Sequence, residues 1–211
     1  MASHINLLLI LFHFGINNES IIILYDTKGI FSSPRVWLTF KYFGHKNVFV
    51  LNGGLKKWLK EKKPVTNKKT SFKKGNFISR LSKELLVTKN EVLESINRKN
   101  SLTFDARHKD RFNGKVKEPR KGLRSGHIPG SKNIFWGNLI NRKGTIVSKK
   151  KINKLFNKFP IKNKKIITSC GSGITACILS LSLLHGPKIQ TSVYDGSWAE
   201  WGQNKKLPIS K

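Results

Sequence analysis

The sequence predicts an α/β fold built on a parallel sheet flanked by helices, and two observations support this prediction. Short apolar runs, typical of strands buried on both faces, alternate along the chain with longer runs typical of helices. The order strand, loop, helix, strand, glycine, helix also occurs twice, once in each half of the chain. Alternating strands and helices form parallel sheets, because each helix returns the chain to the start of the next strand.

The first copy of the repeat has two strands and two helices. The run SIIILYD predicts a strand, and SSPRVWLTFKYFG predicts a helix with Ser32 or Ser33 as its cap and Pro34 in its first turn. NVFVLNGG predicts the second strand, and LKKWLKEKK predicts an amphipathic second helix. The segment after Lys63 is polar, lysine-rich and aperiodic, which indicates a linker.

The second copy is longer. A capping box, Thr88 with Glu91, precedes a predicted helix in TKNEVLESI, and SLTFDAR predicts a strand. Residues 107–134 are expected to form a long loop region. Beyond it, KIITSC and TSVYDGS predict strands, and the runs KKKINKLFNKF, ITACILSLSLL and WAEWG predict helices.

Aligning the two copies places Asp26 opposite Cys170, and Gly53 opposite Gly196. Far fewer residues precede Asp26 than precede Cys170 in its own copy, so we expect the first copy to lack its leading strands. This predicts a partial domain over 1–63, a linker over 64–80 and a complete domain over 81–211. A truncated start and a genuine short form both fit this expectation.

The chain is strongly basic. Its 211 residues include 41 Lys and Arg against 11 Asp and Glu, a formal net charge of +30. A nucleic-acid binder is one interpretation, since basic surfaces attract phosphate. However, the lysines are spread over predicted helix and loop surfaces, and no zinc-finger spacing accompanies them. We therefore expect no specific nucleic-acid partner, only weak adhesion to polyanions at low salt.

The N-terminus and the two cysteines bear on the compartment. The apolar run Leu7–Phe12 is too short to span a membrane, and we expect the buried face of a helix there rather than a signal peptide. Cys170 and Cys177 do not form a CxxC pair or a zinc site, and their helical spacing excludes a disulfide. Free thiols suit a reducing compartment, so a cytoplasmic location without membrane attachment is expected.

The stretch SCGSGITAC carries the main chemical signal. Cys170 ends an apolar strand, and ligands of parallel α/β sheets bind beyond the carboxyl ends of the strands. Gly171 and Gly173 allow the backbone to curl so that successive N–H groups point at an anion, and the following helix adds its positive dipole end. Both effects stabilise a thiolate or a persulfide.

Two other interpretations of these cysteines are open. A free cysteine is often a buried structural residue; this is our expectation for Cys177, whereas the flanking glycines favour a functional Cys170. Cysteine phosphatases need an arginine six positions after the cysteine to hold the phosphoryl oxygens, and that position is Ala176. Phosphoryl transfer is therefore disfavoured.

Four separated motifs resemble one known family. CGSGITAC resembles the active-site loop of 3-mercaptopyruvate sulfurtransferases in the rhodanese superfamily. FDARHKDRFNGKVKEPRKGLRSGHIPGSKNI and YDGSWAEWG resemble two further signatures, and GIFSSPRVWLTFKYFGHKNVFVLNGGLKKWL resembles the non-catalytic first domain of that family. The resemblance implies a rhodanese-like fold, one complete domain preceded by a partial copy.

The resemblance also implies a mechanism and its residues. Cys170 would take sulfur from 3-mercaptopyruvate or thiosulfate as a persulfide, cradled by the loop Gly171, Ser172, Gly173, Ile174 and Thr175, and pass it to cyanide or to a thiol such as thioredoxin or a low-molecular-weight thiol. The neutral loop favours mercaptopyruvate. Arg111 and Arg120 would bind the donor's carboxylate and keto oxygens, and Ser172 would assist proton transfer. No metal or organic cofactor is implied.

Other residues in these motifs are expected to be structural. His127 shapes a turn beneath the site, Asp105 ends a strand, and Asp195 with Gly196 closes a turn. The family's His and Asp partners from the first domain are missing. The alternative function is therefore a catalytically weak persulfide carrier or binding module with a degenerate first domain.

Overall fold

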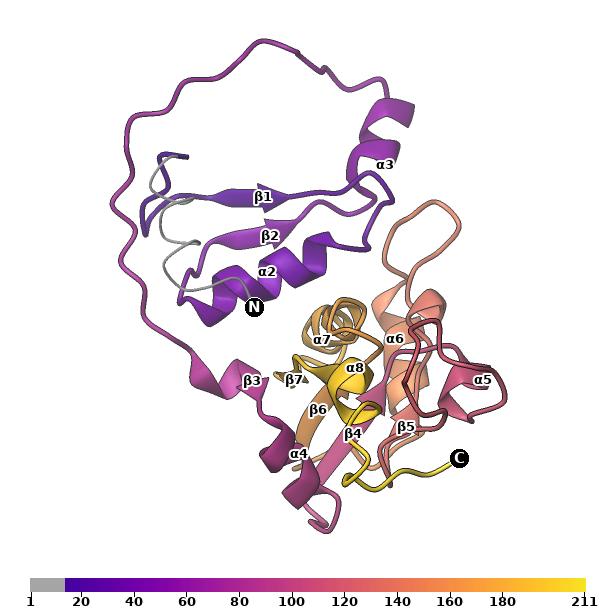
Figure 1. The fold of residues 1–211 in the computed structure, drawn as a ribbon. Helices are drawn as coiled ribbons and strands as arrows, with labels where there is room; N and C mark the ends of the chain where they lie inside the picture. Colours follow the sequence, from indigo (N-terminus) through magenta and orange to yellow (C-terminus); the bar gives the residue numbers. More distant parts are fainter. Residues whose placement is uncertain (1–13) are drawn as a thin grey trace.

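The computed structural model describes residues 14–211 and contains two parallel sheets (Figure 1). The smaller sheet pairs β1 (Ile22–Leu24) with β2 (Val48–Val50). Helix α2 (Ser33–Tyr42) connects the two strands, and α3 (Gly54–Lys60) follows β2. This strand–helix–strand–helix order confirms the order predicted for the first copy of the repeat, as far as the structure describes that copy.

The larger sheet has five parallel strands in the order β3-β7-β6-β4-β5. Its central strands β4 and β6 pair over their full lengths, Ser101 with Lys165 through Asp105 with Ser169. The strands of this sheet are β3 (Leu86–Val87), β4 (Ser101–Asp105), β5 (Lys132–Asn133), β6 (Lys165–Ser169) and β7 (Ser192–Tyr194). The helices around it are α4 (Lys89–Ser95), α5 (Lys109–Phe112), α6 (Lys149–Phe156), α7 (Ala176–His185) and α8 (Ser197–Trp201).

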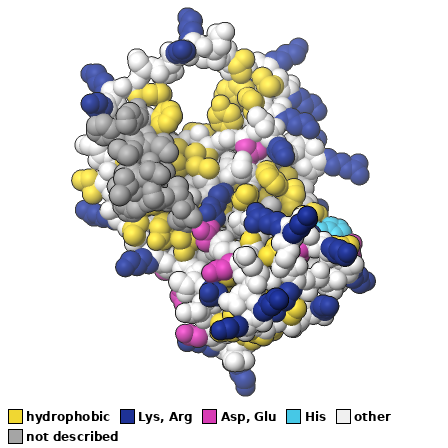
Figure 2. Space-filling model, viewed as in Figure 1, with side chains coloured by type: hydrophobic (Ala, Val, Ile, Leu, Met, Phe, Trp, Pro, Cys, Tyr) yellow, Lys and Arg dark blue, Asp and Glu magenta, His cyan; other side chains and the backbone are white. Residues whose placement is uncertain are grey.

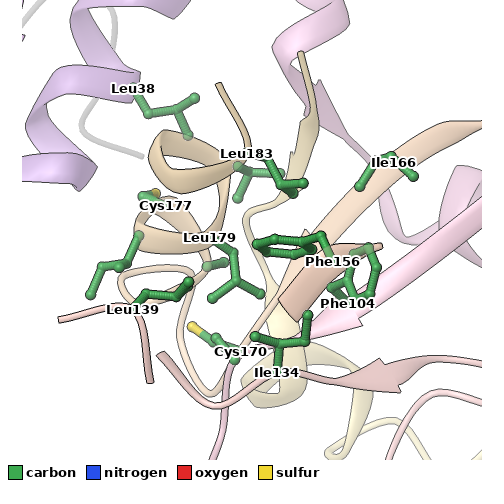
Figure 3. Close-up of a cluster of buried hydrophobic side chains, with 14 of the residues drawn as sticks. Leu38, Phe104, Ile134, Leu139, Phe156, Ile166, Cys170, Cys177, Leu179 and Leu183 are labelled. Atoms are coloured by element: carbon green, nitrogen blue, oxygen red, sulfur yellow. The ribbon is translucent and has the colours of Figure 1, made fainter. Parts of the chain in front are cut away.

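Helices cover both faces of the larger sheet. Successive strand residues point to opposite faces, so Ile166 packs in the cluster with α6 and α7 while Ile167 packs in the cluster with α4 and α8. Helix α2 of the first copy lies against α7, where Leu38 joins the core of the second copy (Figure 3). The two copies therefore share one apolar core through α2 and α7.

Several local predictions are confirmed. The Thr88–Glu91 capping box starts α4, with the Thr88 N–H donating to Glu91 Oε2 at 2.8 Å and the Glu91 N–H donating to Thr88 Oγ1 at 3.3 Å. Pro34 lies in the first turn of α2, and Ser32 is its N-cap residue. The Ser32 side chain makes no capping hydrogen bond; a carboxylate from the preceding loop takes that role, as described below.

Two predictions need comment. Residues 107–134, expected to be a long loop, contain the short helix α5 and strand β5, because four- and two-residue elements leave no periodicity to detect. The helix expected around Leu7–Phe12 lies outside the described residues. Residues 63–82 have neither helix nor strand and run as an open arc between the copies (Figure 1). Among residues 14–211, no helix has the length and apolarity needed to cross a bilayer.

Candidate active site

Cys170 is the first residue after β6, at the carboxyl end of a central strand of the larger sheet. Its backbone is fixed from the β7–α8 turn: its N–H donates to Ser197 Oγ at 3.1 Å, and its carbonyl accepts the Trp198 N–H at 2.9 Å. Both groups lie at the amino end of α8, so the final helix of the fold determines where the cysteine backbone lies.

The loop Gly171–Thr175 joins Cys170 to α7. Gly173 has a φ of 80°, a left-handed conformation that glycine adopts far more easily than other residues. Within residues 14–211, none of the five backbone N–H groups of this loop donates to a protein acceptor. Unpaired N–H groups beside a helix N-terminus favour an anion. The loop thus has the donors that an anionic sulfur needs.

The corresponding loop of the first copy already holds an anion. Asp26, which aligns with Cys170, accepts the N–H groups of residues 31–33 at 2.8–3.1 Å, the Ser33 hydroxyl at 2.8 Å and the Lys28 N–H at 2.9 Å. Partial burial by itself raises the pKa of Asp26, but these hydrogen bonds lower it below its ordinary value. In one copy the loop therefore binds its own carboxylate, and in the other it has a thiol at the aligned position.

Cys170 is enclosed. The residue is 1% exposed and belongs to the main apolar cluster, where Ile134 and Leu139 lie beside it (Figure 3). The burial agrees with the structural interpretation of a free cysteine, whereas the unpaired loop donors agree with the functional one. The sulfur lies on the α7 side of the sheet, because residues 166, 168 and 170 face the same side of β6.

Arg111, one of the two predicted donor-binding arginines, lies at the cysteine loop. A Cβ atom placed on Gly171 would be 3.2 Å from Arg111 Nη2, so the guanidinium contacts the first residue of the loop. Arg111 also pairs with Glu118, with Nη2 and Oε2 2.5 Å apart. Arg120, the second predicted arginine, is exposed and makes no hydrogen bond or ion pair with any residue of 14–211. The structure therefore brings Arg111 to the loop and does not bring Arg120 there.

A cluster of buried charged side chains holds the Arg111 guanidinium in place. Arg107 binds both carboxylate oxygens of Asp105 and donates to Glu118 Oε1 at 3.0 Å, and all three side chains are at most 2% exposed. The Arg107 guanidinium also stacks over the Trp198 ring at 4.4 Å. Glu118 thus bridges a fully buried arginine and the arginine at the cysteine loop, which fixes the direction of Arg111.

A family model of the rhodanese-like domain matches this chain over residues 3–61 and 88–204, which includes both copies of the repeat. The chain belongs to the rhodanese-like domain family. Its two matched segments contain the Asp26 loop and the Cys170 loop, respectively.

Several similar proteins are sulfurtransferases by name. The chain is 36% identical over 217 residues to thiosulfate/3-mercaptopyruvate sulfurtransferase 1, mitochondrial, of Arabidopsis thaliana, covering 92% of this chain and 57% of that protein. It is 35% identical over 190 residues to 3-mercaptopyruvate sulfurtransferase of Mus musculus, covering 89% of this chain and 64% of that protein. The chain thus spans less than two thirds of the length of these relatives.

The fold agrees with a solved structure. The crystal structure of SseA from Escherichia coli, a 3-mercaptopyruvate sulfotransferase by its description, superimposes with a TM-score of 0.79 at 31% identity. The superposition covers 92% of this chain and 72% of SseA. It confirms the predicted rhodanese-like sheet flanked by helices.

The remaining predicted residues of this rhodanese-like site differ in what surrounds them. Ser172 is half-buried and makes no side-chain hydrogen bond within residues 14–211. His127 stacks on Phe112 at 3.8 Å and bonds its carbonyl, which agrees with a structural residue. Cys177 is fully buried, as expected, and donates to the Gly173 carbonyl at 3.1 Å; burial raises its pKa to about 12.

Sequence reasoning missed two arginines near the loop. The Asp-x-Arg spacing of Asp105 and Arg107 could have suggested a local ion pair, although not its burial. Arg35 pairs with Asp195 across the two copies, a contact that no short-range pattern encodes. Asp195 was expected only to close a turn. Burial alone would raise the pKa of Asp195, but Arg35 holds that pKa below its ordinary value.

Proposed function

We propose that this chain is a sulfurtransferase that moves a sulfane sulfur from 3-mercaptopyruvate, or from thiosulfate, through a persulfide on Cys170 to a thiol or to cyanide. The observation that carries the proposal is the cysteine at a sheet's carboxyl edge. It is followed by a loop whose five backbone N–H groups donate to no acceptor in the described part of the chain, and Arg111 contacts that loop. The relatives' names supply the donor class.

The proposed chemistry has two balanced steps. The Cys170 thiolate attacks the thiol sulfur of 3-mercaptopyruvate, the carbon–sulfur bond breaks, and the bonding pair leaves with pyruvate enolate, which takes up a proton. Cys170 keeps the sulfur as a persulfide. An acceptor thiolate then attacks the outer sulfur, which leaves as the acceptor's persulfide and regenerates the Cys170 thiolate. No external oxidant or reductant is needed.

The loop and the arginines have separate roles in this proposal. The N–H groups of the loop Gly171–Thr175 stabilise the negative charge on the thiolate and on the persulfide, in the way that the first-copy loop holds the Asp26 carboxylate. Arg111 presents a planar guanidinium suited to the donor's carboxylate. Because Glu118 already occupies part of Arg111, the donor competes with that carboxylate. Arg120 would have to move inward to contact the same donor.

The proposal extends to the surroundings of the site. We propose a non-catalytic partial domain over 1–63, a linker over 64–80 and a catalytic domain over 81–211, with Ser172 assisting proton transfer at the loop. A reducing location such as the cytoplasm is supported by the two free cysteines, and thioredoxin or a low-molecular-weight thiol serves as acceptor.

Mass spectrometry of the Cys170 peptide tests the chemistry. After incubation with 3-mercaptopyruvate, the peptide should gain one sulfur atom, and Cys170→Ser should abolish the gain. The matched control is Cys177→Ser, which removes the other thiol and should leave the added sulfur in place. An unmodified Cys170 peptide from folded protein would refute the proposal.

A second function is that of a persulfide carrier with little turnover. Cys170 is 1% exposed, so any donor reaches the sulfur only when the surrounding residues move, and slow opening would keep turnover low. A carrier would accept sulfur from a protein persulfide but release little pyruvate. Steady-state pyruvate release separates the two functions: multiple turnovers per chain support the enzyme, and release below one equivalent supports the carrier.

A further inference from the structure

Among the described residues of the first copy, Arg35 reaches the cysteine loop. Arg35 lies in the first turn of α2, and its guanidinium pairs through Nη1 with Asp195 Oδ1 in the β7–α8 turn. Both side chains are mostly covered, at 21% and 28% exposure. The ion pair therefore joins the two copies at the point where the β7–α8 turn meets the cysteine loop.

This ion pair lies directly against Gly173. A Cβ atom on Gly173 would be 2.9 Å from Arg35 Nη1, 3.1 Å from Asp195 Oδ1 and 2.6 Å from the Asp195 carbonyl oxygen. The loop is thus held between two supports: the β7–α8 turn, which bonds the Cys170 backbone, and the guanidinium of the first copy, which covers Gly173.

We propose that Arg35 is a positioning residue for the cysteine loop. Through Arg35 the first copy fixes the position of the loop and places a positive charge beside Cys170. The inference rests on the proposed role of Cys170 as the reactive thiol. It gives the first copy, which has a carboxylate in place of the nucleophile, a task in the chemistry of the second. The loop itself has no charged side chain, so the nearest charges come from other elements.

Within residues 14–211, the charged and titratable groups that face the loop come from four places. Arg35 approaches from α2, and Asp195 from the β7–α8 turn. Arg111 approaches from α5 with its partner Glu118. Cys177 faces the loop from α7, and burial keeps its thiol protonated at neutral pH. Replacing Arg35 with a neutral residue removes one positive charge beside the loop, and replacing Asp195 with a neutral residue removes one negative charge there.

These opposite charges make the proposal testable with the full chain. Alkylation of Cys170 by iodoacetamide is followed as a function of pH by mass spectrometry of its peptide. The plateau rate reports access to the sulfur, and the midpoint of the profile reports its ionisation. We expect Arg35→Gln to move the midpoint to higher pH and Asp195→Asn to move it to lower pH, by about half a unit or more each. Arg98→Gln, which breaks the exposed Arg98–Glu94 pair, is the matched control and should move nothing.

An Arg35–Asp195 ion pair with a purely structural role gives a different result. If the ion pair only holds the copies together, both variants change the plateau in the same direction and leave the midpoint in place, which overturns the proposal. If Arg35→Gln fails to fold, the two single variants Arg35→Lys and Asp195→Asn still test the proposal. The midpoint of the alkylation profile should stay unchanged in Arg35→Lys and should move to lower pH in Asp195→Asn. Because alkylation needs no sulfur donor, a chain without sulfurtransfer would refute the proposed function and leave this result standing.

Discussion

At the residue scale, the aligned loops of the two copies differ in the side chain that precedes them: a carboxylate in the first copy and a thiol in the second. Asp26 and Cys170 occupy aligned positions between a parallel strand and the helix that follows. The Asp26 carboxylate takes the loop's N–H groups for itself, whereas those of the Cys170 loop have no protein acceptor among the described residues. An occupied loop cannot serve a substrate, so this difference is the reason that the proposed chemistry is assigned to the second copy.

Replacing Asp26 with Asn tests how much this loop depends on a negative charge. The amide keeps the shape but has one acceptor oxygen for a site that takes four backbone N–H groups and a hydroxyl. We expect a loss of ~1–2 kcal/mol in the free energy of unfolding at neutral pH, measured by urea denaturation.

The pH dependence of that loss has a defined sign. The folded-state pKa of Asp26 is below its ordinary value, so the carboxylate stabilises the fold above the unfolded-state pKa of about 3.9. As the pH falls from there through the folded-state pKa, this contribution disappears. The difference in stability between the wild type and Asp26→Asn should therefore shrink in acid. A difference that stays constant down to low pH would show that the charge has no part in it.

At the element scale, the sequence predicted the main strands and helices because their apolar periods are long enough to detect. Helix α7 is predominantly apolar, β6 contains an apolar pair at Ile166 and Ile167, and the Thr88–Glu91 box marks the start of α4. By contrast, β3 and β5 have two residues each and exist only because neighbouring strands pair with them. Short elements of this kind are decided by tertiary contacts, which no local pattern carries.

The candidate site, too, was only partly predictable from the sequence. The glycines around Ser172 indicated a curled loop, and motif resemblance indicated Arg111, which the structure brings to Gly171. The sequence could not indicate that Glu118 joins Arg111 to a buried Arg107, or that Arg35 crosses between the copies. These partners are separated by up to 160 positions along the chain, and only the packed fold brings them together.

Alanine substitutions at two glycines separate the cost of a left-handed backbone from the cost of the contact between the cysteine loop and the β7–α8 turn. Gly173 and Gly122 both have a φ of 80°, but a Cβ on Gly173 would meet the Asp195 carbonyl oxygen at 2.6 Å, whereas nothing lies within 4 Å of one on Gly122. Gly122→Ala should cost only the left-handed conformation, about 1 kcal/mol. Gly173→Ala must also displace the β7–α8 turn, and we expect a loss of ~2–4 kcal/mol together with loss of Cys170 persulfidation. Equal losses in the two variants, measured by urea denaturation, would contradict the predicted contact between the loop and the turn.

At the scale of the whole molecule, the excess of positive charge is distributed rather than concentrated. Lys and Arg side chains appear all around the visible face, with few acidic neighbours (Figure 2). Several carboxylates are already engaged, since Asp105, Glu118 and Asp195 pair with arginines. Most lysines are therefore repelled by other cationic side chains across the solvent. Such self-repulsion favours the expanded unfolded chain over the compact fold.

Salt should consequently stabilise this protein. At ~0.02 M ionic strength the Debye length exceeds 20 Å and the repulsion among the lysines acts across the molecule, whereas at ~0.5 M it falls to about 4 Å. The surface ion pairs, such as Lys57–Glu61 and Arg98–Glu94, contribute little and lose little when screened. We expect the midpoint of thermal unfolding to rise by several degrees over this range in NaCl. A lysine-neutralised sample, prepared by partial acetylation, should show a smaller rise because it has less repulsion to screen. A midpoint that falls with added NaCl would mean that ion pairs, and not the net charge of +30, dominate the electrostatics of the fold.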